Sequence, residues 1–236
     1  ESLNPMKTSR VSLEDIAHWD NLTEAAWRAA QGKRERPEVA RFLSNLNPEL
    51  SRLAGDILGG GLELGQARRF TIHDPKTRVI TAPCFRERVV HHALMRFVAP
   101  VLQRAMVPDS FACIPGRGTH KAVLRAQAHV RRFPWFVKVD IRQYFPSIAH
   151  EILSAALERK FRDSGVRSLI AQLVRAYPTA PGLGLPIGAL TSQWFANYYL
   201  DPLDRFLLAD TRVRGLVRYM DDSAFWTETS ENAKAL

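Results

Sequence analysis

The chain reads Leu216-Val217-Arg218-Tyr219-Met220-Asp221-Asp222-Ser223-Ala224-Phe225-Trp226, so two adjacent carboxylates stand between two short apolar runs. Both runs alternate in the way that a half-buried strand does, which predicts a tight hairpin with Asp221 and Asp222 at its tip. Two fixed anions at one turn favour a strongly cationic ligand. The alternative is an ordinary turn, because Asp is a common turn residue.

A second acidic position lies upstream, where the apolar segment Trp135–Val139 ends in Asp140. We expect a buried strand that ends at this carboxylate. Three carboxylates at two strand ends are what two divalent cations about 4 Å apart need for in-line phosphoryl transfer. In this interpretation Asp140 and Asp221 bridge two Mg²⁺ ions and Asp222 supports them, because Mg²⁺ prefers oxygen ligands. The alternative is a turn plus a strand-end cap.

The composition is that of a globular protein with one sizeable core or two lobes. The chain has 236 residues, of which 46% are apolar, and no uninterrupted apolar run approaches the ~18 residues that span a membrane. Glu1 to Met6 shows no signal-peptide pattern. The two cysteines, Cys84 and Cys113, form no metal-ligand or disulfide framework, so we expect a reducing, cytoplasmic location without membrane contact.

The net charge of +9 is concentrated in the first part of the chain. Residues 1–138 hold 22 Lys and Arg against 13 Asp and Glu, whereas residues 139–236 hold 11 of each. A basic part beside an acidic metal site suits a polyanionic substrate whose backbone is held while one phosphate reacts. A solvated basic surface is the alternative.

The pattern of apolar residues predicts a mixed α/β fold. Residues 12–65 show helical periodicity that ends at Gly59-Gly60-Gly61. The remaining expected elements are a hairpin at 69–82 with its turn at 74–77, a helix at 86–99 that Pro100 kinks or ends, helices at 148–162 and 166–177, a long helix at 191–208, and strands at 135–140 and 215–227. We expect these strands to form a small sheet with helices on one face.

Three further features have nucleotide-binding interpretations. Lys76 and Arg78 alternate along one strand, where two cations could clasp a triphosphate; ordinary surface charge is the alternative. Phe145 lies five residues past Asp140, where an aromatic ring could stack under a sugar and exclude a 2′-hydroxyl, although a core Phe is the alternative. The glycine-rich loop 184–188 would let a flat ligand approach the backbone, unless it is a plain linker.

Taken in order, these pieces resemble the fingers and palm of a reverse transcriptase over roughly residues 60–228. The resemblance is carried by five motifs, namely Lys76–Ile80, the loop Pro115–His120, Val139–Ile141 with Phe145, Gly184–Gly188 with Ser192-Gln193, and Tyr219–Asp222. Each motif is short, and the resemblance rests on the order and spacing of all five.

The resemblance implies an RNA-directed DNA polymerase with an α/β (α+β) right-hand fold. We expect an N-terminal helical extension at 1–59, fingers at 60–138 and a palm at 139–236. Members of this family normally continue into a helical thumb that grips the duplex, so we expect weak or no processive synthesis from these 236 residues alone.

The resemblance also assigns roles to individual residues. Asp140, Asp221 and Asp222 are the implied catalytic residues, and these three with Ile141 form the implied metal site for two Mg²⁺ ions, with Mn²⁺ as a substitute. The implied nucleotide contacts are Lys76, Arg78, Phe145, Ile187 and Gln193. The implied nucleic-acid contacts are Arg117, His120 and Lys121. The implied partners are an RNA template, a DNA or RNA primer and dNTPs.

One departure from the family pattern points to a subclass. Most reverse transcriptases carry Gln where this chain has Ile187, and the stretch Ile187–Gln193 instead resembles enzymes of diversity-generating retroelements and related bacterial unknown-group and defence-associated enzymes. Ile cannot donate the hydrogen bonds by which Gln holds the nucleotide sugar, and one such bond contributes roughly 0.5–1.5 kcal/mol. We therefore expect an error-prone enzyme that works with a small basic accessory protein.

Three alternatives stay open from the sequence. The first is an antiviral-defence or abortive-infection reverse transcriptase. The second is a non-catalytic nucleic-acid-binding scaffold, which three clustered anions near a phosphate backbone disfavour. The third is an RNA-templated RNA polymerase, which Phe145 disfavours.

Overall fold

The computed structural model describes residues 8–73 and 76–236. They form a mixed α/β fold, which confirms the predicted class. The chain divides into two compact units, each built from two separated segments. Unit 1 comprises Glu1–Val101 and Phe145–Gln193, and unit 2 comprises Leu102–Tyr144 and Trp194–Leu236. The predicted boundaries of the extension, fingers and palm stay a prediction.

Unit 1 is mainly helical. It holds α1 (Leu13–Ala17), α2 (Trp19–Ala30), α3 (Pro37–Ser44), α4 (Leu46–Gly59), β1 (Ala67–Ile72), β2 (Arg78–Pro83), most of α5 (Phe85–Ala105) and of α7 (Tyr144–Ser147), α8 (His150–Glu158), α9 (Ser164–Arg175) and the start of α10 (Leu190–Tyr199). Helix α5 continues through Pro100, which corrects the expected end near Ala99. In the described part of the chain no helix is long and apolar enough to cross a membrane.

The N-terminal helices brace the first part of α5. Asn21 Nδ2 donates to the Ala93 carbonyl at 3.1 Å, and the ring centroids of Phe42 and Phe85 lie 5.0 Å apart in a T-shaped contact. An ion pair joins Arg88 to Glu38 at 2.7 Å. These contacts give residues 13–59 a structural role in unit 1.

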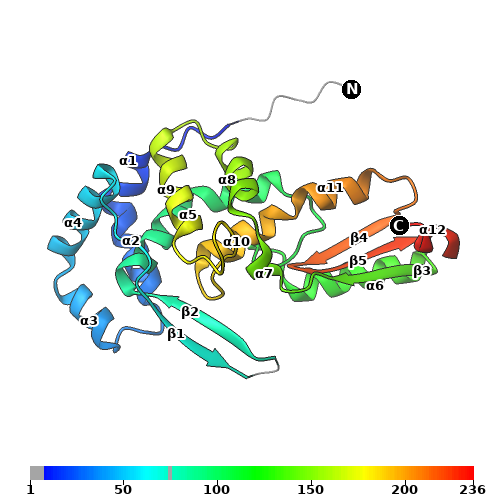
Figure 1. The fold of residues 1–236 in the computed structure, drawn as a ribbon, viewed down its shortest axis with the longest axis horizontal. Coiled ribbons are helices and arrows are strands. Elements are labelled where there is room, and N and C mark those ends of the chain that lie inside the picture. The colour runs from blue at the N-terminus through cyan, green and yellow to red at the C-terminus, as the bar shows by residue number, and fades with distance from the viewer. Residues whose placement is uncertain (1–7, 74–75) are drawn as a thin grey trace. The chain divides into compact units, whose positions relative to one another are not determined.

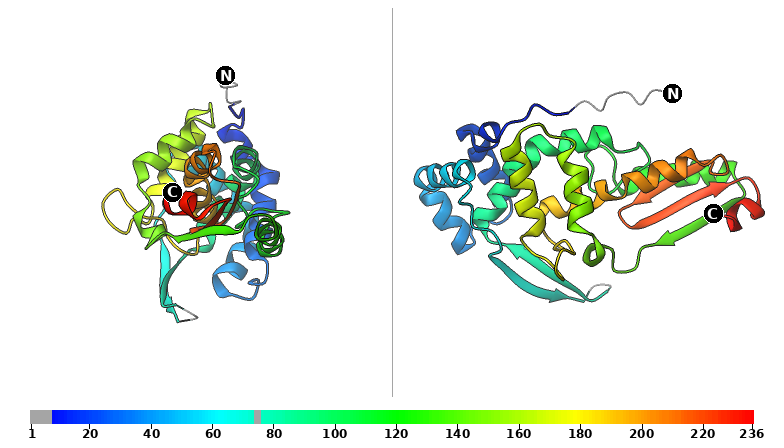
Figure 2. Two further views of the ribbon diagram at one scale, coloured as in Figure 1. Left: turned by 90° about the vertical axis from the view of Figure 1, so that its right-hand side faces the viewer. Right: turned by 45° about the horizontal axis from the view of Figure 1, so that its top comes forward.

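Strands β1 and β2 form an antiparallel hairpin from Ala67↔Pro83 to Ile72↔Arg78. It extends as a ribbon from the helices of unit 1 (Figures 1 and 2). The predicted turn covers 74–77; its first two residues, Asp74 and Pro75, fall outside the described residues, whereas Lys76 and Thr77 lie within them. The predicted strand pairing is thus present.

Unit 2 is built around a three-stranded antiparallel sheet of order β3-β5-β4. Its elements are the end of α5, α6 (Thr119–Arg132), β3 (Trp135–Asp140), the rest of α10, α11 (Asp201–Ala209), β4 (Gly215–Tyr219), β5 (Asp222–Thr227) and α12 (Ser230–Lys234). The expected single helix at 191–208 is wrong, because the chain breaks at Leu200 and α11 restarts with Pro202 in its first turn.

Helices cover both faces of this sheet, not one as expected. On the face that we call face A, Ala122 of α6 packs with Val217 and Trp226. On the opposite face, face B, Leu207 of α11 packs with Leu216 and Phe225. Figure 1 shows α6 and α11 on either side of the strands.

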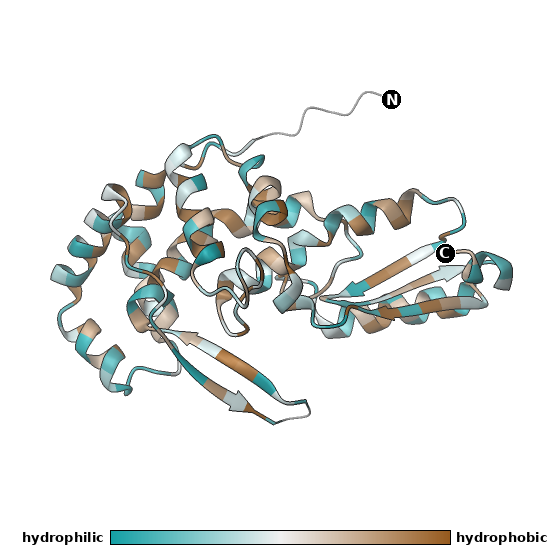
Figure 3. Ribbon diagram, in the orientation of Figure 1, coloured by the Kyte–Doolittle hydropathy of each residue, from teal (hydrophilic) through white to brown (hydrophobic). Residues whose placement is uncertain are grey.

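Strand β3 is the exposed edge of the sheet, which corrects the expectation of a buried strand. Phe136 is 58% exposed and Trp135 is 49% exposed. Figure 3 shows the hydrophobic character of this strand. The large side chains of this run remain substantially open to solvent, so burial does not explain its apolar residues. Strand propensity does, because β-branched and aromatic residues are enriched in strands.

Candidate active site

Two of the three predicted carboxylates meet across neighbouring strands of unit 2. Asp140, the last residue of β3, pairs directly with Asp222, the first residue of β5. Side chains of directly paired residues lie on the same face of a sheet, which places both carboxylates at one end of face A. The two sequence-distant acidic motifs therefore form one local cluster.

Asp221 lies in the loop that connects β4 to β5. Because Tyr219 pairs with Asp222, this hairpin has a two-residue loop of Met220 and Asp221. Met220 has a φ of +61°, and positive φ at the first loop position is typical of a type II′ hairpin turn, where glycine is the usual residue. The tight hairpin is present as predicted, with Asp222 already in the strand.

The oxygen ligands suit a hard divalent cation. Asp140 and Asp222 offer carboxylates on one face, and Mg²⁺ typically uses one or two carboxylates together with water and substrate phosphates. Lys138 Nζ lies 3.3 Å from an Asp222 carboxylate oxygen and supplies a positive charge there. Within residues 8–73 and 76–236, no three His, Cys, Asp or Glu side chains gather as a ready-made metal site. The structure thus brings Asp140 and Asp222 together, and two carboxylates of this kind are oxygen ligands that suit Mg²⁺.

The predicted nucleic-acid contacts lie at the start of α6. Thr119 Oγ1 donates to the hydroxyl oxygen of Tyr219 at 3.0 Å, which ties this helix end to the hairpin. His120 and Lys121 follow on the exposed first turn. Arg117 is partly occupied with its own loop, because its Nη1 donates to the carbonyls of Val107 and Ser110 at 2.7 and 2.8 Å.

The predicted nucleotide contacts lie in unit 1, where three of their segments are joined by backbone hydrogen bonds. The Thr81 amide of β2 donates to the Ile187 carbonyl at 2.8 Å, and the Leu185 amide donates to the Phe145 carbonyl at 2.9 Å. Gly188 packs so tightly against β2 that a Cβ there would lie 2.8 Å from the Thr81 carbonyl oxygen. Strand β2, the loop 184–188 and Phe145 thus form one assembly.

The side chains of the predicted nucleotide contacts differ in exposure. Lys76, Arg78 and Gln193 are exposed, whereas Phe145 and Ile187 are half-buried. Exposed cations are able to reach a triphosphate, and half-buried apolar groups are able to shape a pocket wall. Ile141 is half-buried directly after β3.

A buried polar network lies behind the hairpin of β4 and β5 that carries Asp221 and Asp222, which we call the carboxylate hairpin. This network is the main feature that the sequence did not predict. Arg218 is 0% exposed and Asp204 is 1% exposed, and the Arg218 Nη2 lies 2.7 Å from an Asp204 carboxylate oxygen. The available signal was an Arg inside an otherwise apolar strand, Leu216-Val217-Arg218. Such an Arg needs a buried partner.

A second buried polar network lies in unit 1. Tyr177 donates its hydroxyl proton to Glu87 Oε2 at 2.7 Å, and His91 Nδ1 lies 2.9 Å from Thr191 Oγ1. Burial and the hydrogen bond to Glu87 raise the pKa of the Tyr177 hydroxyl. This network joins α5 to the start of α10, next to Gln193.

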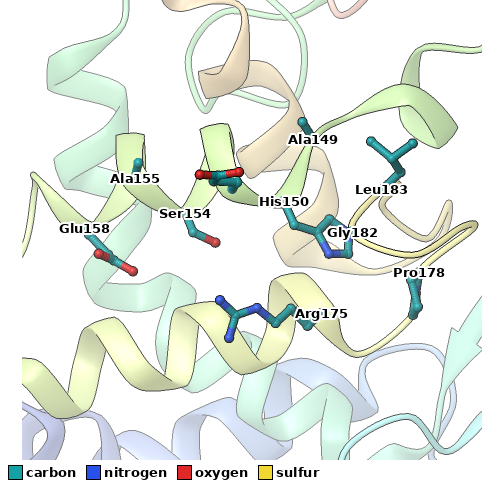
Figure 4. Close-up of a pocket in the computed structure, with 10 residues that line it drawn as sticks. Ala149, His150, Ser154, Ala155, Glu158, Arg175, Pro178, Gly182 and Leu183 are labelled. Carbon is teal, nitrogen blue, oxygen red and sulfur yellow. The ribbon is translucent and has the colours of Figure 1, made fainter.

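A large cavity of unit 1 lies elsewhere. Its volume is about 810 Å³, and Figure 4 shows Glu158 and Arg175 beside it. It is lined by Ala149, His150, Glu151, Ser154, Ala155, Glu158, Arg175, Pro178, Gly182 and Leu183. None of the predicted site residues lines it.

The family model for reverse transcriptase (RNA-dependent DNA polymerase) matches residues 72–236. The chain belongs to the reverse transcriptase family. The matched range includes Lys76 and Arg78 and the three carboxylates Asp140, Asp221 and Asp222. The family resemblance seen in the sequence is thereby confirmed, whereas the match does not distinguish the diversity-generating class.

Relatives of this reverse transcriptase chain share low identity with it. Protein YkfC of Escherichia coli K12 is 25% identical over 177 residues, which are 70% of this chain and 46% of the relative. The group II intron-encoded protein LtrA of Lactococcus lactis is 26% identical over 56% of this chain and 23% of the relative. The putative COX1/OXI3 intron 2 protein of Saccharomyces cerevisiae is 26% identical over 67% of this chain and 20% of the relative. The chain thus spans less than half the length of these relatives.

Proposed function

We propose that this chain carries the catalytic palm and the nucleotide-binding fingers of an RNA-templated DNA polymerase. The observation that carries the proposal is the pairing of Asp140 with Asp222 beside Asp221, within a chain of the reverse transcriptase family. RNA template, primer and dNTPs are the proposed substrates.

In this proposal Asp140, Asp221 and Asp222 hold Mg²⁺, with Mn²⁺ as a substitute and the Ile141 backbone beside the site. Two ions bound there would lower the pKa of the primer 3′-hydroxyl and neutralise charge on the leaving pyrophosphate. Lys138 Nζ lies 3.3 Å from an Asp222 carboxylate oxygen, where it would compete with a metal ion for that oxygen.

The remaining predicted residues bind and select substrate. Exposed Lys76 and Arg78 contact the triphosphate, and half-buried Phe145 disfavours a 2′-hydroxyl at the sugar. Ile187 and Gln193 complete the nucleotide contacts. The hydrogen bonds that join β2, the loop 184–188 and Phe145 support this grouping.

The template and primer contacts are proposed for Arg117, His120 and Lys121. His120 and Lys121 are exposed on the first turn of α6, where they are able to reach a phosphate backbone. Arg117 also holds its own loop through Nη1. Its proposed contact therefore uses the remainder of the guanidinium.

Primer extension tests the function. The natural protein at its full length is given a defined RNA template, a primer, Mg²⁺ and dNTPs, beside the double variant Asp221→Asn/Asp222→Asn. We expect extension by the wild type and a loss of at least about 10³-fold in the variant, because metal-assisted stabilisation is removed. RNA binding without any DNA synthesis by the wild type would instead support the scaffold alternative.

We further propose an error-prone enzyme of the diversity-generating class, which works with a small basic accessory protein. The supporting observation is Ile187, whose side chain cannot replace the hydrogen bonds of Gln. Ile187→Gln is expected to lower misincorporation opposite template adenine by up to about tenfold. An unchanged error spectrum would reject this assignment.

A defence-associated enzyme is the alternative, and defence genes beside the coding sequence would favour it.

A second candidate class comes from the relatives. LtrA is a group II intron-encoded protein, and the yeast relative is a putative intron protein. An intron-associated enzyme would bind its own intron RNA more tightly than unrelated RNA of equal length. A template and variable repeat pair beside the coding sequence would favour the diversity-generating class.

A further inference from the structure

The side chain of Arg218 lies behind the carboxylate hairpin, and its guanidinium group is fully hydrogen-bonded. Its Nε donates to the Asp204 carboxylate at 2.7 Å, and its Nη2 donates to Asp204 at 2.7 Å and to the Asn197 carbonyl at 2.9 Å. Its Nη1 donates to Asn197 Oδ1 at 2.7 Å and to the Met220 carbonyl at 3.0 Å. All five N–H groups of the guanidinium therefore have acceptors.

The bond to Met220 connects this network with the proposed metal site. Met220 is the first residue of the two-residue loop, and it has a φ of +61°. This region of φ is unfavourable for a residue with a side chain, so the conformation needs support from its surroundings. The guanidinium supplies that support at the carbonyl directly before Asp221.

The strand geometry keeps Arg218 away from the proposed chemistry. Arg218 pairs with Ser223, one position from the Tyr219↔Asp222 pair, so its side chain lies on face B while the Asp222 carboxylate lies on face A. Its amide donates to the Asp109 carbonyl and its carbonyl accepts from the Phe111 amide, both at 2.9 Å. Backbone and side chain are therefore both anchored.

The rest of the network is equally well satisfied. Asn197 Nδ2 donates to the Ala112 carbonyl at 2.6 Å, and Ser110 Oγ donates to Asn197 Oδ1 at 3.0 Å. Burial raises the pKa of the Asp204 carboxyl, and the Arg218 guanidinium acts in the opposite direction. A buried ion pair is a costly way to gain stability, whereas it is well suited to fixing one geometry.

We propose that Arg218 is a positioning residue for the polymerase site. From face B, it holds the Met220 carbonyl and thereby fixes the orientation in which Asp221 and Asp222 are presented to metal. Asp204 and Asn197 orient the guanidinium. This proposal rests on the proposed polymerase function.

Arg218→Lys provides the main test, because a lysine keeps the charge but cannot reach Asp204, Asn197 and Met220 at once. The full-length protein is assayed for thermal unfolding, for Mn²⁺ binding without nucleic acid, for hydrogen exchange of residues 219–223, and for extension against Mg²⁺ concentration. We expect weaker Mn²⁺ binding, faster exchange at the hairpin, a higher half-saturating Mg²⁺ concentration, and a rate lowered about 10- to 100-fold.

Arg214→Lys is the matched control. Arg214 lies just before β4 and forms an exposed ion pair with Glu228 at 3.1 Å, so its replacement is expected to change none of these readouts. Met220→Gly in the Arg218→Lys background is expected to recover part of the lost Mn²⁺ binding, because glycine adopts positive φ without a penalty.

A folded Arg218→Lys protein with wild-type Mn²⁺ binding and Mg²⁺ dependence would overturn the proposal. If this variant does not fold, Asp204→Asn decides in its place, and loss of folding in both would make Arg218 a folding residue only. Absence of extension by the wild type would instead count against the polymerase function. Mn²⁺ binding and hydrogen exchange keep the two failures distinguishable.

Discussion

Three residues with side chains adopt positive φ in the described part of the chain, namely Cys113 at +54°, Gln143 at +51° and Met220 at +61°. Cys113 precedes the loop of Arg117, Gln143 lies between Asp140 and Phe145, and Met220 precedes Asp221. Each such conformation costs about 1–3 kcal/mol and persists only where the surroundings impose it. At the residue scale, strained backbone therefore accompanies the segments proposed to contact metal or nucleic acid.

Gly188 also has a positive φ, of +120°, but glycine adopts this conformation without strain. We expect Gly188→Ala to lower the free energy of unfolding by about 1–3 kcal/mol, because its Cβ would lie 2.8 Å from the Thr81 carbonyl oxygen. Urea unfolding measures this change. Gly61→Ala is the control, because nothing lies within 4 Å of the added Cβ. Equal effects of the two substitutions would contradict the tight packing at Gly188.

His92 makes stability depend on pH. Burial, followed by the charges of His91, Arg28, Lys33 and Arg88, lowers the pKa of His92 from 6.5 to about 4. Between pH 6.5 and about pH 4 the unfolded chain binds a proton at His92, whereas the folded chain does not. The stability that neutral His92 contributes is therefore fully present above pH 6.5 and is lost as the pH falls toward about 4. His92→Gln is expected to flatten the loss of stability between pH 7 and pH 4.5, measured by urea unfolding. An unchanged slope would show that other groups cause it.

At the scale of elements, the sheet of unit 2 separates the proposed chemistry from its support. Alternation along β3, β4 and β5 places Asp140 and Asp222 on face A and Arg218 on face B. Helix α11 covers face B and supplies Asp204. A one-residue shift in register would exchange these faces, so the pairing itself determines where the carboxylates lie.

The exposed edge strand β3 has a measurable consequence. Its Phe136 is 58% exposed beside a free strand edge, and exposed apolar edges favour pairing with another chain. We expect Phe136→Thr to reduce self-association of the 236-residue chain at high concentration, measured by light scattering. The control is Phe206→Thr on α11, which is 71% exposed but on a helix. Equal effects of the two variants would mean that general hydrophobicity, not the strand edge, drives association.

At the scale of the whole molecule, charge and chain path are the informative properties. The excess of basic residues lies in residues 1–138, which contribute to both compact units. The chain passes from one unit to the other after Val101, Tyr144 and Gln193. The proposed metal ligands fall in unit 2 and the proposed nucleotide contacts in unit 1.

The net charge of +9 predicts a strong salt dependence of RNA binding. With about three phosphate contacts, affinity is expected to fall at least about tenfold between 50 and 200 mM salt, because bound counterions are released. Fluorescence anisotropy with a single-stranded RNA measures this, with Lys121→Ala expected to reduce the slope of log affinity against log salt by about 0.7. Affinity independent of salt would contradict phosphate-dominated binding.

The sequence by itself determined the mixed α/β class, the order of the motifs and the family, because strand and helix periodicities and the spacing of charged residues are local properties. It also placed Asp221 and Asp222 at a hairpin, since a turn between two apolar runs is a local signal. The fine assignments of metal, nucleotide and RNA contacts stay predictions.

Only the tertiary structure decided which residues meet. The pairing of Asp140 with Asp222, helices on both faces of the sheet, and the bonds from Arg218 to Asp204 and Met220 all join positions distant in sequence or depend on burial. Strand β3 appeared buried from its apolar residues, but its edge position left them exposed. Burial and register arise from the packing of whole elements, which no local pattern encodes.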